Sequence, residues 1–283
     1  MEHEWGGRAV SWKRKWQRCS RMKRLVCVGL DPDLRRLPKV IATYKNSVFL
    51  FNKELIDATA DLVMGFKFQM AHYGAQYLED QLLKTTVYLQ KHHPEKMIIL
   101  DGKRGDIGST AEMYAKEAYG RYGADAVTLN PYMGWDSVRP FVQDPAKMAF
   151  VLCRTSNPTS LDFQDLVYDG QPLYQRVAQQ AVTQWSEHGN IGLVVGATFP
   201  QHMANVRRVA PEVPFLVPGV GFQGGSVTSC LRAGGEKQIF TSSRGVIYAS
   251  PCAQFADKAR TVVQAMDAEI RCFRPGFIPN LSI

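Results

Sequence analysis

Short apolar runs alternate with longer amphipathic stretches along most of this chain, and this alternation constrains the fold more than any other feature of the sequence. Each of eight runs of strand length is followed by a stretch with helical periodicity. Strands separated by helices form a parallel sheet, because a parallel neighbour is reached only through a crossover. Eight such units in about 250 residues match a closed (β/α)8 barrel in count and length. The sequence therefore predicts an α/β protein, a (β/α)8 TIM barrel with a single domain.

The hydrophobic period and the turn residues set the boundaries of these units. The expected strands cover residues 25–30, 62–68, 97–100, 125–129, 148–153, 191–195, 215–217 and 238–241. The expected helices cover residues 47–60, 75–91, 110–122, 134–142, 173–188, 200–209, 226–232 and 253–270. No linker or low-complexity tract separates them. We therefore expect one barrel domain over residues 25–272, preceded by a basic extension (1–24) and followed by a tail broken by Pro and Gly (273–283).

Charged side chains occur at the ends of several expected strands, where a barrel places its active site. Asp101 and Lys103 follow the apolar run 97–100, Asp31 follows the first strand, and Lys67 lies near the end of the second. A buried charge costs several kcal/mol unless it is paired. Alternating lysines and aspartates offset this cost, and the carboxylates keep the lysines protonated. The sequence therefore predicts a Lys/Asp cluster in the mouth of the barrel.

The segment that begins at Asp101 has the spacing D-x-K-x-x-D, which is by itself more typical of a solvated loop than of a site. Its position after a buried strand favours a site. Because alternate residues of an extended strand share a face, Asp101 and Lys103 are expected to project together. Asp106 follows Gly105 in a loop and need not face the same way. A helix is expected to begin at Thr110.

A glycine-rich turn, from Pro218 to Ser226, follows the seventh expected strand. Its G-x-G-x-x-G spacing is weak evidence for a dinucleotide, because it lies in the wrong unit and no acidic residue ends the next strand. Glycines do let backbone N–H groups approach an anion, and barrels hold phosphate in the loops after their last two strands. Gln223 and Arg244 supply donors in these two loops. We prefer a phosphate site to the alternative that the glycines only form tight turns.

Composition restricts the class of protein. The hydrophobic content of 45% and the charged content of 21% are ordinary for a soluble globular protein. No apolar run approaches the roughly 20 residues needed to span a bilayer, and the N-terminus lacks the apolar segment of a secretory signal. The six cysteines form no C-x-x-C pair and the histidines no H-E-x-x-H pattern. We therefore expect no metal site, no membrane association and a cytoplasmic location.

The net charge of +8 is concentrated at the N-terminus, where residues 1–24 hold eight basic and two acidic side chains. Trp12 and Trp16 are spaced i, i+4, so they form one apolar edge of a short helix, with lysines and arginines solvated around it. A basic extension can also bind nucleic acid or acidic lipid. We favour the solvated helix and do not expect a nucleic-acid partner.

Eight stretches of the sequence, in order and suitably spaced, resemble the orotidine 5'-phosphate decarboxylase family in its longer bacterial-type form. They are V-G-L-D-P-D (28–33), F-K-F-Q (66–69), L-D-G-K-R-G-D-I-G-S-T-A (100–111), G-A-D-A-V-T-L-N-P-Y-M-G (123–134), C-R-T-S-N-P (153–158), G-L-V-V-G-A-T-F-P (192–200), V-P-G-V-G-F-Q-G-G (217–225) and S-S-R (242–244). Together they span nearly the whole chain beyond residue 24. The D-x-K-x-x-D-I-x-x-T segment combined with the P-G-x-G-x-Q loop is highly specific.

This resemblance implies decarboxylation of orotidine 5'-phosphate to UMP and CO2, the last step of de novo pyrimidine nucleotide synthesis, without metal or organic cofactor. It implies Lys103 as the general acid that protonates C6. Asp101 would lie against the substrate carboxylate, and Lys67 would complete the charge network and touch the ribose.

The resemblance also implies contacts to the rest of the nucleotide. Asp31 would bind a ribose hydroxyl and Ser156 the edge of the pyrimidine. The expected substrate-binding residues at the phosphate end are Pro218, Gln223 and Arg244. Asp106 and Thr110 would reach into the neighbouring subunit's site, which implies a homodimer with shared active sites.

The chain departs from the family pattern at Gly102, where Ala is usual, and at Thr159, where Gly is common; neither residue is assigned to chemistry. Two alternatives remain open. One is a metal-dependent phosphosugar decarboxylase or aldolase on the same scaffold. The other is a non-enzymatic barrel whose basic extension binds nucleic acid.

Overall fold

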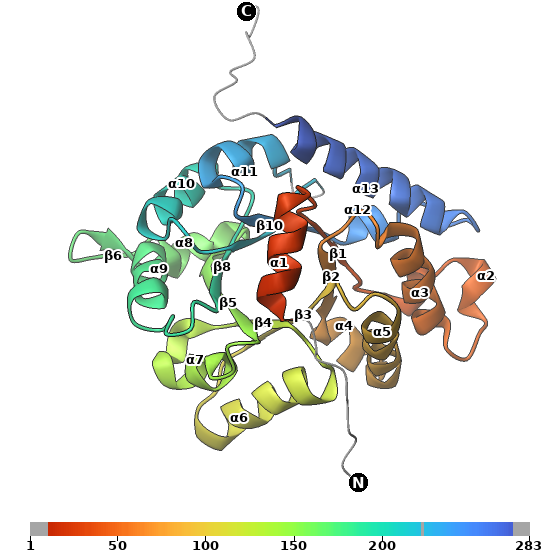
Figure 1. Ribbon diagram of the computed structural model, residues 1–283, viewed down its shortest axis with the longest axis horizontal. Coiled ribbons are helices and arrows are strands. Elements are labelled where there is room, and N and C mark those ends of the chain that lie inside the picture. Colours follow the sequence, from red (N-terminus) through yellow and green to blue (C-terminus); the bar gives the residue numbers. More distant parts are fainter. Residues whose placement is uncertain (1–10, 222–223, 274–283) are drawn as a thin grey trace, which may run out of the picture.

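The computed structural model of this 283-residue chain describes residues 11–221 and 224–273. Eight parallel strands close into a barrel in the order β1-β10-β9-β8-β5-β4-β3-β2 (Figure 1). The barrel strands are β1 (Val26–Gly29), β2 (Gly65–Gln69), β3 (Met97–Arg104), β4 (Ala126–Leu129), β5 (Met148–Arg154), β8 (Ile191–Val195), β9 (Phe215–Pro218) and β10 (Gln238–Ser242). Each expected strand is present within a few residues of its expected bounds. The prediction of a (β/α)8 barrel is confirmed.

Helices surround the barrel and alternate with its strands (Figure 1). The main helices are α3 (Ser47–Thr59), α5 (Glu79–His92), α6 (Gly108–Lys116), α7 (Trp135–Val142), α9 (Leu173–Thr183), α10 (Pro200–Val209), α11 (Val227–Gly234) and α13 (Phe255–Cys272). Shorter elements are η1 (Leu34–Arg36), α2 (Lys39–Ala42), α4 (Met70–Gly74), a π-turn η2 (Glu117–Arg121), η3 (Pro131–Met133) and α12 (Arg244–Ile247). Among the described residues, no helix has both the length and the apolar composition to cross a membrane.

Most helix boundaries, with η2 counted as part of α6, lie within two residues of their expected positions, such as the start of α6 at Gly108 rather than Thr110, but two differ by four or five residues. The stretch 75–91 was expected to be one helix, but α5 begins only at Glu79, because Tyr77 has a φ of 56° and this left-handed conformation ends the preceding α4. Helix α9 ends at Thr183, five residues before the expected end at His188. The strands themselves matched well because their side chains are buried on both faces, which produces continuous apolar runs.

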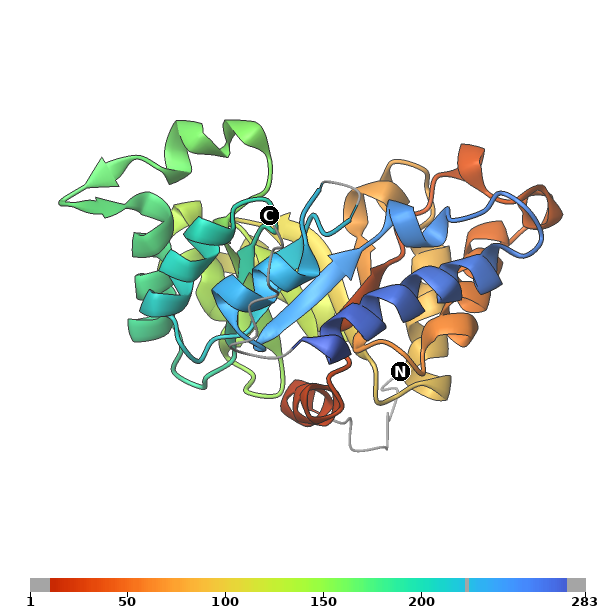
Figure 2. The same ribbon diagram turned by 90° about the horizontal axis from the view of Figure 1, so that it is seen from above.

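Helix α1 (Trp12–Arg21) lies across the end of the barrel where the strands begin (Figures 1 and 2). Trp12 is buried and Trp16 packs against the core, as the apolar edge predicted. The expectation that every lysine of this helix is solvated is wrong for Lys15, which is buried. Its Nζ donates to Asp125 Oδ2 at 2.8 Å and to the carbonyl of Lys96 at 2.9 Å. This ion pair connects the basic extension to the body of the barrel.

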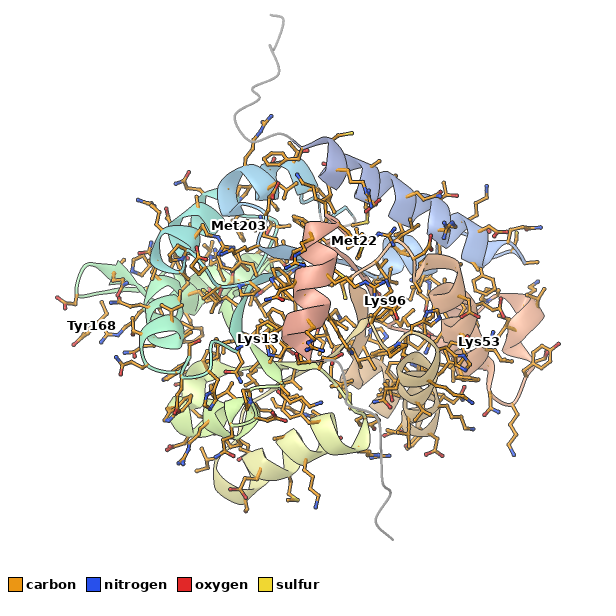
Figure 3. All side chains as sticks on the ribbon, in the orientation of Figure 1. Lys13, Met22, Lys53, Lys96, Tyr168 and Met203 are labelled. Atoms are coloured by element: carbon orange, nitrogen blue, oxygen red, sulfur yellow. The ribbon has the colours of Figure 1, made fainter. Side chains whose placement is uncertain are left out.

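An excursion of residues 155–172 connects β5 to α9, where no helix or strand was expected. It contains η4 (Pro158–Ser160), α8 (Leu161–Gln164) and the antiparallel pair β6 (Val167–Tyr168) and β7 (Gln171–Pro172). Asp169 and Gly170 between the two strands have φ values of 51° and 73°, and Asp-Gly is a preferred pair for such a turn. The hairpin extends away from the barrel, with the Tyr168 side chain at its outer end (Figures 2 and 3).

Candidate active site

Four charged side chains meet at the mouth of the barrel: Asp31 follows β1, Lys67 lies in β2, and Asp101 and Lys103 lie in β3. Lys67 Nζ lies 2.9 Å from Asp101 Oδ2 and 3.8 Å from Asp31 Oδ1, and Lys103 Nζ lies 2.7 Å from Asp101 Oδ1. The order Lys67–Asp101–Lys103 therefore alternates in sign, as expected from the sequence, and Asp31 extends the alternation by one residue. Lys67 and Asp101 are buried, whereas the Lys103 side chain is 43% exposed. The structure thus brings these four predicted residues together.

The cluster keeps its buried members ionised. Burial alone would raise the pKa of Asp101, but the charges of Lys67 and Lys103, with a hydrogen bond from each, hold it well below its ordinary value. Burial would likewise lower the pKa of Lys67, yet the carboxylates of Asp31 and Asp101 raise it above its ordinary value. At neutral pH, Asp101 is therefore an anion and Lys67 a cation.

Thr128, in β4, is a member of this cluster that sequence reasoning missed. Its Oγ1 donates to Asp101 Oδ1 at 2.8 Å and accepts from the backbone N–H of Lys103 at 3.0 Å. The hydroxyl therefore fixes both the carboxylate and the backbone that carries the lysine. Thr128 belongs to the stretch 123–134 that carries the family resemblance. No pattern in the sequence indicates that its side chain faces Asp101 on the neighbouring strand.

The backbone at Lys103 is not the regular strand that the sequence suggested. Lys103 has a φ of 46°, and the register between β3 and β4 shifts between Leu100 and Arg104. A left-handed conformation is costly for a residue with a long side chain, and such strain is concentrated at functional sites. Asp101 and Lys103 do meet, but through this irregularity rather than through strand alternation.

Asp31 is fixed from two sides. Its Oδ1 accepts from the backbone N–H of Gln69 at 3.0 Å. The preceding carbonyl, of Leu30, accepts from the hydroxyl of the buried Tyr73 at 2.8 Å, and Asn52 in turn donates to that hydroxyl. The first carboxylate of the array is thereby held in place by α4 and α3, the helices that carry Tyr73 and Asn52.

Asp106 and Thr110 lie apart from the charge cluster. Asp106 is half-buried in the loop after β3 and accepts from the backbone N–H of Ile107. Thr110 is exposed in the first turn of α6. Ile107 and Met113, on either side of Thr110, are 54% and 57% exposed, so this surface is unusually apolar for a charged loop.

Ser156 follows β5 on the same rim of the barrel and is half-buried. Its carbonyl accepts from Thr198 Oγ1 at 3.3 Å. A Cβ on Gly196 would lie 2.8 Å from the Ser156 nitrogen, so only glycine lets the loop after β8 approach this closely.

The loops after β9 and β10 are where the sequence predicts a phosphate site. Gly219, Gly221 and Gly224 have φ values of 94°, 75° and 84°, so each adopts a conformation that favours glycine. Pro218 ends β9 and pairs with Thr241 of β10, which places this turn beside the start of α12 at Arg244. Gln223 lies outside the described residues.

Metal ligands are not grouped in the part of the chain that the structure describes: it holds no set of three or more His, Cys, Asp or Glu side chains placed to bind an ion. Its six cysteines are all free, and four of them are buried.

Comparison with known proteins identifies the family. A model described as "Orotidine 5'-phosphate decarboxylase / HUMPS family" matches residues 24–262. The chain belongs to the orotidine 5'-phosphate decarboxylase / HUMPS family. The resemblance seen in the sequence is therefore confirmed, and the charge cluster lies on a decarboxylase-family barrel.

Individual relatives agree with this family assignment. The chain is 49% identical over 263 residues to an orotidine 5'-phosphate decarboxylase of Ralstonia nicotianae, covering 92% of this chain and 96% of the relative. A solved OMP decarboxylase of Leishmania donovani superimposes with a TM-score of 0.79 at 32% identity, covering 93% of this chain and 100% of that chain. A UMP synthase of Leishmania donovani gives a TM-score of 0.83 at 35% identity, covering 93% of this chain but only 56% of the longer one.

Proposed function

We propose that this chain decarboxylates orotidine 5'-phosphate to UMP and CO2, with Lys103 donating the proton to C6 and without a metal or organic cofactor. The observation that carries the proposal is the Lys67–Asp101–Lys103 array on a barrel of this family. A buried anion between two cations, one of which is exposed to the mouth, suits a reaction in which a carboxylate leaves and a proton arrives.

The chemistry follows from the charges. Asp101 remains ionised, so a substrate carboxylate placed beside it is repelled in the ground state, and this repulsion ends when CO2 departs. The bond from C6 to the carboxyl carbon breaks and its electron pair stays on C6. The ammonium of Lys103 stabilises this developing charge and then transfers a proton to C6. Its exposed side chain recovers a proton from solvent.

The remaining predicted residues suit the other parts of the nucleotide. Asp31 and Lys67 suit the ribose hydroxyls, and Ser156 suits the pyrimidine edge. The glycine turn that begins at Pro218, together with Gln223 and Arg244, suits the 5'-phosphate. Phosphate bound at a distance from C6 supplies binding energy that orients the base against the charge array.

A homodimer with shared sites is part of the proposal. Asp106 and Thr110 do not join the cluster of their own barrel, and they lie beside the exposed apolar side chains Ile107 and Met113. A second copy that covers this surface would bury apolar area and bring both polar residues to its own mouth. A cytoplasmic location also remains a prediction.

The experiment that tests this function is the loss of orotate absorbance when purified protein is mixed with orotidine 5'-phosphate after exhaustive chelation. We expect full turnover in the chelated sample, because the proposed chemistry uses only side chains. Activity that is lost on chelation and restored by Mg²⁺ would favour the metal-dependent phosphosugar class instead. Absence of turnover, combined with a salt-sensitive affinity for RNA that vanishes on deletion of residues 1–24, would favour the non-enzymatic alternative.

A further inference from the structure

Arg154, the last residue of β5, is fully buried and has no part in the mechanism described above. A buried guanidinium is costly unless its donors are satisfied. The register between β5 and β8 shifts between Leu152 and Arg154, and irregularities of this kind redirect side chains next to active sites. Its position at the end of β5 and the free-energy cost of burying its charge together indicate that this arginine stabilises the loop that follows it.

One side of the guanidinium is anchored to the outer layer of the barrel. Arg154 Nε donates to His202 Nδ1 at 3.0 Å and lies 3.3 Å from Asp165 Oδ1, while its Cζ lies 4.3 Å from the centre of the Phe199 ring. Burial, followed by repulsion from Arg154, lowers the pKa of His202, so the neutral ring can accept this hydrogen bond. Helix α10, which carries His202, therefore holds the arginine in place.

The other side of the guanidinium forms hydrogen bonds with the turn that contains Ser156 and with Gln164 beyond it. Arg154 Nη1 donates to the carbonyl of Thr155 at 3.1 Å, to Gln164 Oε1 at 3.2 Å and to Ser160 Oγ. Gln164 Oε1 also accepts from the Thr155 backbone N–H at 2.9 Å, and its Nε2 donates to Thr155 Oγ1 at 2.8 Å. The residue before Ser156 is thus held through both its backbone and its side chain.

The residue after Ser156 is held by the same network. Ser160 Oγ, which accepts from Arg154, donates to the carbonyl of Asn157 at 2.6 Å, and Thr155 Oγ1 pairs with Asn157 Oδ1 at 2.7 Å. The backbone is therefore fixed to Arg154 immediately before Ser156, and through one hydroxyl immediately after it. Loops position reacting groups less accurately than strands do, so a loop residue that must meet a substrate needs such support.

We propose that Arg154, acting through Gln164 and Ser160, is a positioning residue that holds Ser156 against the pyrimidine of the substrate. The inference rests on the proposed function, because it takes Ser156 as the residue that meets the base. Arg154 itself touches no reacting atom. Its effect is on recognition of the base rather than on binding of the phosphate.

The test is Gln164→Met, which keeps the size of the side chain and removes its hydrogen bonds to Arg154 and Thr155. We expect affinity for UMP to fall about tenfold while affinity for ribose 5-phosphate, which lacks the base, stays unchanged. Gln171→Met is the matched control, because Gln171 lies in the same excursion and its amide donates to Gln179 rather than to the turn that contains Ser156. Equal loss of affinity for both ligands, or no loss for either, would overturn the proposal.

A double-variant comparison separates positioning from a general effect on the fold. In a Ser156→Ala background, Gln164→Met should cause no further loss of UMP affinity, because the residue that it positions is already gone. Additive losses would contradict the proposal. Arg154→Lys, where it folds, should behave as Gln164→Met does. A wild-type protein with no decarboxylase activity would refute the proposed function, whereas an active wild type with an unaffected Gln164→Met variant refutes only the role of Arg154.

Discussion

Asp101 is the residue on which the electrostatics of the site depend. It is held by Lys67, Lys103 and Thr128 at 2.9, 2.7 and 2.8 Å. These three partners come from three strands, so the carboxylate is held in one orientation. Fixed charges of this kind stabilise a transition state without reorganisation, because their orientation is already set when the reaction begins.

Replacement of Thr128 by Val removes the hydroxyl that orients Asp101 while nearly preserving the shape of the side chain. One donor to Asp101 and one acceptor for the Lys103 N–H are lost, so we expect kcat/KM for orotidine 5'-phosphate to fall about 10- to 100-fold. Thr183→Val, at an exposed position near the end of α9, is the control and should leave kcat/KM unchanged. Wild-type kcat/KM for Thr128→Val would show that this hydroxyl does not set the geometry of the cluster.

The ionisation of Asp101 gives a pH dependence with a definite sign. Its pKa in the folded protein lies below the ordinary value of 3.8, so its stabilising contribution is fully present above about pH 4 and is lost as the pH falls further. The free energy of unfolding of the wild type, measured in urea, should therefore exceed that of the Asp101→Asn variant by more at pH 7 than at pH 3. For Lys67, whose pKa is raised above 10.5, the contribution is present below that pH and is lost above it. If the difference in free energy of unfolding between wild type and Asp101→Asn does not change with pH, the pKa of Asp101 is not lowered in the folded protein.

At this scale, the sequence predicted side-chain chemistry better than side-chain partners. Asp31, Lys67, Asp101 and Lys103 stood out because charges are unusual after buried strands. Thr128 was not predicted because its role depends on a contact with Asp101, more than 20 residues away in the sequence. Arg154 was not predicted because its position depends on a local irregularity of β5. Short-range sequence patterns carry no information about either.

Among the elements, α1 is the one whose role changed most between sequence and structure. The spacing of Trp12 and Trp16 was sufficient to predict a helix with one apolar edge. It could not predict the burial of Lys15, because Asp125 lies 110 residues away in the sequence. The hairpin β6–β7 was missed for a different reason: strands of two residues have too few positions to show alternation, although Asp169-Gly170 was a usable turn signal.

Lys15→Met tests whether α1 is part of the barrel's folding unit. The variant leaves Asp125 buried with its remaining hydrogen bond to the Ile98 N–H but without its cation, so we expect the free energy of unfolding to fall by about 3 kcal/mol. The charge cluster lies at the other end of the strands, so kcat and KM at 25 °C should not change. Arg14→Met, on the exposed face of the same helix, is the control and should lose less than about 0.5 kcal/mol. Equal stability of the two variants would mean that the ion pair contributes nothing.

In the whole molecule, the charge cluster and the contacts of α1 that stabilise the fold lie at opposite ends of the closed barrel. Helix α1 lies across the end of the barrel where the strands begin (Figure 2). The charge cluster, the turn that contains Ser156 and the start of the glycine-rich turn at Pro218 follow the ends of the strands. Segments as distant as Asp31 and Arg244 share one rim because β1 pairs with both β10 and β2. The fold could be predicted from the sequence because eight strand–helix units are the number that closes a barrel. The number of units does not predict whether two copies of the chain assemble.

Mixed dimers test the proposed sharing of sites. Lys103→Ala and Asp106→Asn should each be nearly inactive alone. When they are unfolded and refolded together, one site of every mixed dimer carries no substitution, so specific activity should return to about a quarter of wild type. The measurement is the rate of orotate absorbance loss against the mixing ratio. No recovery, in mixtures shown to contain heterodimers, would contradict shared sites.

Lys103→Ala tests the central claim most directly. The rate of loss of orotate absorbance with orotidine 5'-phosphate should fall by about a thousandfold or more, since both the proton donor and a cation beside the developing charge are removed. The variant should unfold at a temperature near that of wild type, because Lys103 is half-exposed. Lys84→Ala, at an exposed position in α5, should keep full activity. Turnover of Lys103→Ala near the wild-type rate would contradict the assignment of Lys103 as the proton donor.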